Sequence, residues 1–390
     1  METTVIHIAD FTTPHAGGFV SSLRALAAKA RESGFRIVLV FPAAAQHASW
    51  AVQMQQDDIS LRFLPSGLSL WRLVQRIVDI VREENAEILH THFSNFNFPA
   101  GLAKLLLWLA NRKVIIIWHF HSDWRTRLTL KRRIKDLLLY RILGRTAFGI
   151  AVSDNIRQAM GQRGMPLQRM RYIPNGFDAD RLAMGEKSPA TVRCELGIPK
   201  QAKVFLAFGW EPLTKGVDLL LAAFEKLAAA RNPSDIVLLM IGTDTMRQYV
   251  HDWNRGNQPF WQYLAEPRER VAEFFAASDA FISASRSEGF PYSIVEAMAS
   301  KLPVVSSDIP GAAWARGVPG VVFFPPGDAD ALSKAISQML SWTDDERSAN
   351  SNANCSFVTE RYSLNQWAEN VLSYYTDLLM DNSIRTGEYQ

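Results

Sequence analysis

Strand-like apolar runs alternate with helix-like segments throughout the first half of this chain. Strands are predicted at residues 5–9, 36–41, 87–92, 114–119 and 147–152. The segments between them are predicted to be helical, at residues 17–31, 71–84, 102–111 and 128–143. Alternation of strands and helices is typical of a parallel sheet with helices on both faces. The order of elements therefore predicts a doubly wound α/β domain.

The same alternation begins again in the second half, which predicts a second α/β domain. Its strands are expected at residues 203–208, 236–241, 280–284 and 304–306. A turn-rich stretch around residues 173–188 separates the halves, so we expect one domain over 1–185 and the other over 186–362. A length of 390 residues exceeds one typical domain, and 48% of hydrophobic residues supports sizeable cores.

Composition narrows the class of protein further. The two cysteines, Cys194 and Cys355, indicate a reducing compartment and give neither a disulfide framework nor a zinc ribbon. The first ten residues have no basic segment followed by an apolar one, so we expect a first strand there and no signal peptide. The most apolar region, residues 102–120, is interrupted by Lys104 and Arg112 and is too broken to span a bilayer. We therefore expect a soluble or peripheral protein.

Two glutamates, Glu288 and Glu296, lie eight positions apart around a predicted strand–loop–helix. Glu288 follows the strand at 280–284, at the end where open α/β sheets bind ligands. Glu296 lies in the helix, whose N-terminus can hold an anion, and its carboxylate can accept hydrogen bonds from ribose hydroxyls. This combination suits a nucleotide-activated sugar. The plainer interpretation is a solvated acidic pair on an ordinary strand–helix unit.

The residues around these glutamates resemble a known family. Gly289-Phe290 follows the first glutamate, Ala297-Met-Ala follows the second, and Pro303-Val-Val and Gly311 come later. This extended Glu-x7-Glu motif resembles that of retaining GT-B glycosyltransferases of family four. The resemblance covers nearly the whole chain and implies two doubly wound, Rossmann-like domains facing across a cleft. It also implies that the last helix, within 363–390, crosses back to the N-terminal domain; the alternative is a simple C-terminal helix of the second domain.

The resemblance implies which residues hold the donor. Gly17 and Gly18 would lie beside its phosphates, although a Gly pair can also be a plain turn. After the strand that ends at Gly209, the family has an Arg and then a Lys; here Trp210 replaces the Arg and Lys215 is kept. Arg286 is one basic residue that would substitute for the missing charge. The full set implied for the nucleotide sugar is Gly17, Gly18, Gly209, Lys215, Gly289, Phe290, Pro291, Tyr292 and Glu296.

Two histidine pairs end predicted strands, at His90 and His92 and at His119 and His121. Because side chains alternate along a strand, both members of a pair lie on one face of the sheet. Such pairs could form a metal site, but strand-end histidines are often structural. In the resembled family a histidine at the end of this strand lies near the transferred sugar. His121 matches that position best and His119 is the competing alignment, so the implied catalytic pair is His121 and Glu288.

Two Asp-x-Asp strings occur, at Asp178–Asp180 and Asp328–Asp330. In other glycosyltransferases such a string holds a metal bound to the sugar nucleotide. Here each string follows a turn and precedes a helix-like segment, so we predict helix N-caps. We therefore expect no metal cofactor.

The segment 124–145 predicts a basic amphipathic helix. It combines bulky apolar residues with an excess of cations over the single acid Asp136. Such a helix suits an anionic membrane surface, and the alternative is a core helix with a solvated basic face. Nucleic acid is not expected, because stacking aromatics are missing and the net charge is only +3. The predicted membrane residues are Arg125, Arg127, Lys131, Arg132, Arg133 and Lys135.

These patterns together predict a retaining glycosyltransferase that uses a UDP- or GDP-linked sugar without a metal. The acceptor would be a glycan, lipid-linked in view of the basic helix, in the assembly of a cell-surface polysaccharide or glycolipid. The expected location is the cytoplasm, at the inner face of the cell membrane if the protein is peripheral. The alternatives are a soluble metabolite glycosyltransferase, a sugar-nucleotide epimerase of the same fold, and a non-catalytic sugar-nucleotide-binding protein.

Overall fold

The computed structural model describes residues 2–13, 16–122, 134, 136–183, 187–230, 235–256, 259, 261–267 and 271–386. The chain forms two compact units, Met1–Gly176 with Leu364–Gln390, and Phe177–Ser363. The predicted boundary was between residues 185 and 186. The segment from Phe177 belongs to the second unit because its backbone N–H donates to Tyr362 O at 2.7 Å. The C-terminal helix belongs to the first unit.

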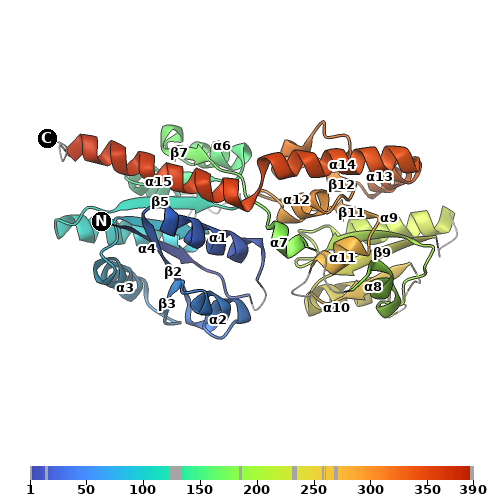
Figure 1. Ribbon diagram of the computed structural model, residues 1–390, viewed down its shortest axis with the longest axis horizontal. Helices are drawn as coiled ribbons and strands as arrows, with labels where there is room; N and C mark the ends of the chain where they lie inside the picture. The colour runs from blue at the N-terminus through green and yellow to red at the C-terminus, as the bar shows by residue number, and fades with distance from the viewer. Residues whose placement is uncertain are drawn as a thin grey trace. The chain divides into compact units, whose positions relative to one another are not determined.

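The first unit is built on a seven-stranded parallel sheet in the order β3-β2-β1-β4-β5-β6-β7 (Figure 1). The strand order reverses between β1 and β4, and this is the switch point where open α/β sheets bind ligands. Its strands are β1 (Thr3–Ala9), β2 (Phe35–Pro42), β3 (Ser60–Leu64), β4 (Ile88–His92), β5 (Ile115–Phe120), β6 (Phe148–Ala151) and β7 (Met170–Tyr172).

Helices cover both faces of this sheet (Figure 1). One face carries α1 (Gly18–Glu32), α2 (Ser49–Gln56) and α15 (Leu364–Thr386), and their apolar residues form one core with alternate strand residues. On the opposite face α3 (Leu70–Glu83) packs against α4 (Asn97–Leu109). The remaining helical segments are α6 (Asp154–Gln162), η1 (Ala43–Ala45), η2 (Ser94–Phe96), η3 (Leu137–Ile142), η4 (Leu143–Arg145) and η5 (Leu167–Arg169).

The C-terminal helix α15 is fixed to the first unit by its apolar side. Trp367, Val371 and Tyr375 recur at intervals of four residues and are all buried in the core that α1 shares. Burying each side chain of this size stabilises the fold by about 1.5–3 kcal/mol. An ion pair between Lys29 of α1 and Glu369, with 3.2 Å between Nζ and Oε1, lies at the rim of this contact. The amphipathic pattern of the tail thus anchors α15 on α1.

The second unit has a six-stranded parallel sheet in the order β10-β9-β8-β11-β12-β13, with its switch point between β8 and β11. Its strands are β8 (Lys203–Phe208), β9 (Ile236–Ile241), β10 (Gln262–Ala265), β11 (Ala280–Ser283), β12 (Val304–Ser307) and β13 (Val321–Phe324). Its helices are α7 (Ala179–Leu182), α8 (Pro189–Glu195), α9 (Val217–Ala230), α10 (Asp244–Trp253), α11 (Ala272–Ala276), α12 (Tyr292–Ala299), η6 (Pro310–Ala315), α13 (Ala329–Leu340) and α14 (Asp344–Arg361).

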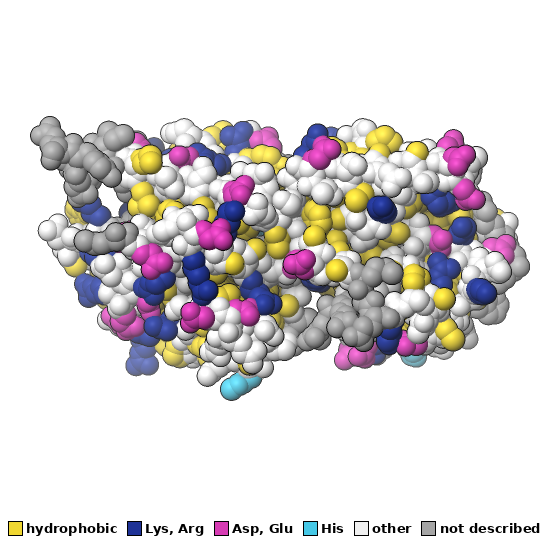
Figure 2. Space-filling view, in the orientation of Figure 1, with side chains coloured by type: hydrophobic (Ala, Val, Ile, Leu, Met, Phe, Trp, Pro, Cys, Tyr) yellow, Lys and Arg dark blue, Asp and Glu magenta, His cyan; other side chains and the backbone are white. Residues whose placement is uncertain are grey.

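The predicted fold class is confirmed, and the differences are local. Helix α4 begins at Asn97, before the predicted start at residue 102. Pro99 is tolerated in its first turn, because the N–H that proline lacks would have no partner within the helix there. The predicted helix over 128–143 lies largely outside the described residues, and Leu137–Ile142 forms a π-helical segment. No helix in the described part of the chain has the length and apolar character needed to cross a bilayer. Acidic and basic side chains are interspersed over the face seen in Figure 2.

Candidate functional site

The switch point of the second unit holds Lys215, predicted to bind the donor, and Glu288, predicted to be catalytic. Lys215 comes from the loop between β8 and α9, and Glu288 from the loop after β11. The Lys215 ammonium contacts Glu288 Oε1 at 2.5 Å, and the same oxygen accepts from Ser285 Oγ at 2.8 Å. Both side chains are only partly exposed, with 22% and 16% of their surface accessible. The pair is therefore a polar centre at the ligand-binding edge of the sheet.

Two glycines bring these loops together. Gly216 has a φ of +68°, and a Cβ at that position would lie 2.2 Å from the backbone oxygen of Ala284. A Cβ on Gly311 would lie 2.1 Å from the backbone oxygen of Glu288. Both distances are far below van der Waals contact, so only glycine allows these close approaches. Gly209, at the end of β8, lies similarly close to the side chain of Met246.

Glu296 is buried in α12 and paired with a residue that the sequence did not indicate. Its side chain is 4% exposed, and Arg181 Nη1 donates to its Oε1 at 2.6 Å. Burial raises the pKa of Glu296, while the positive charge of Arg181 opposes this shift. Arg181 reaches Glu296 from α7, more than 100 residues away along the chain, so no local spacing could have predicted the pair.

The residues between the two glutamates shape the start of α12. Phe290 is buried and its ring stacks on Trp314, with 4.9 Å between centroids. Pro291 is the N-cap residue of α12, and Tyr292 is its first residue. Gly289 joins Glu288 to this buried anchor. The local sequence therefore fixes the position of a helix N-terminus beside Glu288, where an anion is stabilised.

Trp210 and Arg286 determine the charge near this centre. Trp210 stands where the family has an Arg; it is 39% exposed, and its ring lies 6.0 Å from that of Phe208. The Arg286 guanidinium donates to both carboxylate oxygens of Asp218, at 2.8 and 2.6 Å. This hydrogen bonding lowers the pKa of Asp218 and raises that of Arg286. The charge of Arg286 is thus already balanced by Asp218.

Both Asp-x-Asp strings cap helices, as predicted. Asp178 Oδ1 accepts from the backbone N–H groups of Asp180 and Arg181, at 3.0 and 3.3 Å. Asp328 Oδ1 accepts from the backbone N–H of Ala331 at 2.9 Å. These first aspartates satisfy N–H groups that a helix start leaves unpaired.

The switch point of the first unit is occupied by histidines. His7 of β1 lies opposite His90 of β4, and His92 of β4 lies opposite His119 of β5. All four are at most 1% exposed, and they lie on the sheet face that α1 and α15 cover. His121 follows β5 and is partly exposed. The sequence predicted the two pairs but missed His7, which the strand order brings beside them.

The start of α1 lies next to His121. Gly17 is the N-cap residue of α1 and Gly18 its first helical residue. The next side chain, Phe19, places its ring 5.5 Å from the His121 ring. Of the two competing histidines, His119 is completely buried and His121 is the one that reaches the surface.

Burial keeps this cluster uncharged. It lowers the pKa of His7 and of His121 to about 3. The pKa values of His90, His92 and His119 are lowered well below the ordinary value, first by burial and then by the neighbouring rings. Neutral imidazoles can also bind a transition metal. Within the described residues, two triplets have ring nitrogens close enough to share one, with all candidate atoms within 4.8 Å: His7, His90 and His92, and His92, His119 and His121.

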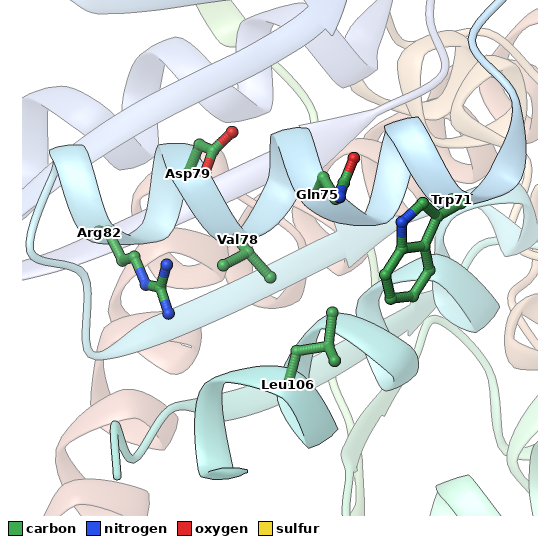
Figure 3. Close-up of a pocket in the computed structure, with 6 residues that line it drawn as sticks. All are labelled: Trp71, Gln75, Val78, Asp79, Arg82 and Leu106. Carbon is green, nitrogen blue, oxygen red and sulfur yellow. The ribbon is translucent and has the colours of Figure 1, made fainter. Parts of the chain in front are cut away.

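The predicted membrane residues Arg125, Arg127, Lys131, Arg132, Arg133 and Lys135 lie outside the described residues. Two large hydrophobic side chains of the helices α3 and α4 are exposed. Trp71 of α3 is 55% exposed and Trp108 of α4 is 65% exposed. Between the two helices is a hollow of about 530 Å³ (Figure 3), lined by Trp71, Gln75, Val78, Asp79, Arg82 and Leu106.

Comparison with solved structures supports the fold. The structure superposes on a glycosyltransferase from Rickettsia africae with a TM-score of 0.80 and 18% identity, covering 97% of this chain and 99% of that one. It superposes on Anabaena HepE in complex with UDP with a TM-score of 0.79 and 18% identity, covering 96% and 100%. At this level of identity the likeness concerns the fold.

Sequence comparison adds the family. A putative glycosyltransferase of Bacillus subtilis, EpsF, is 26% identical over 231 residues, which span 58% of this chain and 59% of EpsF. The sequence profile of Glycosyltransferase Family 4 matches residues 16–181, and that of Glycosyl transferases group 1 matches residues 202–341. These two matches, one in each half, together cover more than three quarters of the chain. The protein therefore belongs to the group 1, family 4 glycosyltransferases of the GT-B type.

Proposed function

We propose that this protein is a retaining glycosyltransferase that moves a sugar from a nucleotide sugar to a glycan acceptor. The observation that carries the proposal is the Lys215–Glu288 pair at the switch point of the second unit, with Glu296 buried one helix turn into α12. The resemblance assigns Lys215 and Glu296 to the donor and Glu288 to catalysis. HepE holds UDP on the same fold, which supports a UDP-linked donor, with a GDP-linked one as the alternative.

Each residue has a distinct proposed role in binding the donor. The Lys215 ammonium and the first turn of α12 stabilise the diphosphate, whose negative charge grows as it leaves. Glu296 accepts hydrogen bonds from the ribose hydroxyls, and the positive charge of Arg181 favours the ionised form of this buried carboxylate. The role proposed for Glu288 is to contact the transferred sugar, and His121 keeps the role at the sugar that the resemblance implies. The leaving diphosphate takes the proton of the acceptor hydroxyl on the same face, so the configuration is retained without a covalent intermediate.

We propose that this transfer needs no metal. Asp178 and Asp328 are used as helix caps, so their carboxylates are engaged with backbone N–H groups. The positive charge at the diphosphate then comes from Lys215 and the helix N-terminus. Activity should therefore survive EDTA. Loss of activity in EDTA that manganese or magnesium restores would overturn the metal-free mechanism.

Transfer assays with point variants test the proposal. Glu288→Gln should lower kcat strongly while UDP still binds, because the residue is placed at the sugar and not at the base. Lys226→Met is the matched control, because it removes a cation from an exposed surface pair with Asp330. Turnover by the wild type that Glu288→Gln leaves unchanged would contradict the assignment. Binding of nucleotide sugars without transfer or hydrolysis would favour the non-catalytic alternative.

The acceptor is proposed to be lipid-linked, in cell-surface polysaccharide or glycolipid assembly. Trp71 of α3 and Trp108 of α4 are exposed, and so are the cations Arg82 of α3 and Lys113, which follows α4; exposed aromatic and basic side chains are of the kind that binds an anionic membrane surface. Flotation with anionic liposomes at low and high salt tests this location, at the inner face of the cell membrane. Trp108→Ser should weaken flotation, with Trp253→Ser of the second unit as the control. If the wild type does not bind anionic liposomes at low salt, a soluble acceptor is the better interpretation.

A further inference from the structure

The buried histidines of the first unit form one unbranched hydrogen-bonded chain that α15 completes. His119 Nδ1 lies 3.2 Å from His90 Nε2, and His90 Nδ1 lies 2.6 Å from the Tyr375 hydroxyl. The same hydroxyl lies 3.0 Å from His7 Nε2. The chain continues from His7 Nδ1 to His92 Nε2 at 2.8 Å, and from His92 Nδ1 to His121 Nε2 at 3.1 Å.

The two ends of this chain differ in their surroundings. His119 Nε2 is buried and has no hydrogen-bond partner among the described residues. At the other end, His121 is the one partly exposed ring of the chain, so its free Nδ1 is the atom that a ligand or water can reach. The phenolic oxygen of Tyr375 in the middle is completely buried.

Counting protons restricts the possible states. Five neutral imidazoles and one hydroxyl carry six protons, and the chain contains five hydrogen bonds. One proton is therefore left over. His7, His90 and His92 use both ring nitrogens in the chain, so the extra proton can only be on His119 Nε2, on His121 Nδ1, or on a Tyr375 hydroxyl turned away from the chain.

Burial decides between these three positions. An extra proton on His119 or on Tyr375 leaves a buried donor without a partner, and such a donor pays the full cost of losing its contact with water. An extra proton on His121 Nδ1 can be donated in a hydrogen bond to water or to a ligand. The buried end of the chain, His119 Nε2, is then only an unpaired acceptor. Orphaned buried N–H groups are the rarer of the two defects in proteins. The lowest-energy arrangement therefore has every proton directed towards His121.

We propose that Tyr375 and the four buried histidines hold His121 as the Nδ1–H tautomer, a hydrogen-bond donor to an oxygen of the transferred sugar. This rests on the proposed function for the identity of the ligand. The Tyr375 hydroxyl donates to His7, His7 to His92 and His92 to His121. These residues are positioning residues that act through His121, and α15 thereby takes part in the site of the first unit.

The test uses the full-length protein labelled with 15N at histidine. Two-bond 1H–15N correlation spectra distinguish the two tautomers directly. In the wild type we expect His121 to be protonated at Nδ1 and bare at Nε2. In Tyr375→Phe the donor to His7 is lost, so His121 should show both tautomers, and KM for the nucleotide sugar should rise about fivefold with the affinity for UDP unchanged.

Tyr374→Phe is the matched control. The Tyr374 hydroxyl is also buried but donates to the backbone oxygen of Arg169 at 3.1 Å, outside the chain. This variant should leave the tautomer of His121 and KM unchanged.

Three outcomes overturn the proposal: an Nε2–H tautomer of His121 in the wild type, an unchanged tautomer in Tyr375→Phe, or a tightly bound metal in the purified protein. Failure of the proposed function gives a different result, because His121 then keeps its tautomer while no nucleotide sugar shifts its signals.

Discussion

Acidification should unfold the first unit, because its buried histidines are neutral in the folded state. In the unfolded chain an imidazole has a pKa of about 6.5. Burial lowers that of His7 to about 3, and those of His90, His92 and His119 lie well below the ordinary value. A depressed pKa of a histidine gives stability that is present above pH 6.5 and is lost as the pH falls towards the folded value.

The magnitude follows from proton linkage. At pH 5 each ring that stays neutral in the folded state costs about 2 kcal/mol of stability relative to neutral pH, since the unfolded chain binds the proton. Counting only the four completely buried rings, and leaving out the partly exposed His121, the sum is about 8 kcal/mol. A domain has only about 5–15 kcal/mol of stability in total. We therefore expect the first unit to unfold near pH 5, on account of these four side chains.

Urea denaturation followed by circular dichroism at several pH values measures the effect. Near pH 5.5 the free energy of unfolding of the first unit should change by about 5 kcal/mol per pH unit, which corresponds to an uptake of about 3.6 protons. Hydrogen exchange of peptides from β4 and β5 assigns the transition to this unit. Removing one buried ring, as in His7→Asn, should reduce the slope of the free energy of unfolding against pH by about a quarter.

The exposed histidines His47 and His251 provide the control. Both lie outside the buried cluster, so replacing both by Asn should leave the dependence of the free energy of unfolding on pH unchanged. An uptake of fewer than two protons at pH 5.5 would refute the reasoning, because the buried rings would then already be charged in the folded protein.

Three further predictions concern the second unit. Glu296→Gln should weaken UDP binding at least tenfold in calorimetry, because the ribose hydroxyls and Arg181 lose a charged acceptor worth about 1.5–3 kcal/mol; unchanged affinity would remove Glu296 from the site. Gly216→Ala should lower the free energy of unfolding of this unit, measured in urea, by at least about 2 kcal/mol, because the residue has a positive φ and the backbone oxygen of Ala284 lies close to it. Trp210→Arg should tighten UDP binding in calorimetry, since it adds a cation near Lys215; weaker binding would show that the exposed tryptophan itself contacts the nucleotide.

The sequence predicted most of the fold, and two residues that the structure brings together, Lys215 and Glu288, for one physical reason. Strand–helix alternation depends on local periodicity, and the Lys215 and Glu288 loops each follow a strand that the apolar pattern marks clearly. Parallel strands bring their carboxyl ends to one edge, so residues after two such strands meet without knowledge of the rest of the chain. The strands that the pattern missed, β3, β7, β10 and β13, are short and lie towards the sheet edges.

The pair of Arg181 and Glu296 could not be predicted in this way. Arg181 follows Asp178, which caps α7, and this local feature indicates a helix start but gives no direction for the arginine side chain. Its position depends on how α7 packs against α12. Nor could the sequence place Tyr375, which reads as one apolar position of an amphipathic tail until α15 is known to cover β1 and β4.

In the histidine chain, tertiary structure gives single residues hydrogen bonds that their own segments do not provide. A buried imidazole nitrogen without a partner costs free energy, and the three rings between the ends of the chain have a polar partner at each nitrogen. Here the partners are other histidines on neighbouring strands, so the strand order β1-β4-β5 supplies the bonds that no segment provides by itself. Because every ring between the two ends needs both neighbours, the orientation of a proton at Tyr375 fixes that at His121. Substitutions along this chain should therefore be non-additive, and the loss of one member leaves its neighbours with most of the cost.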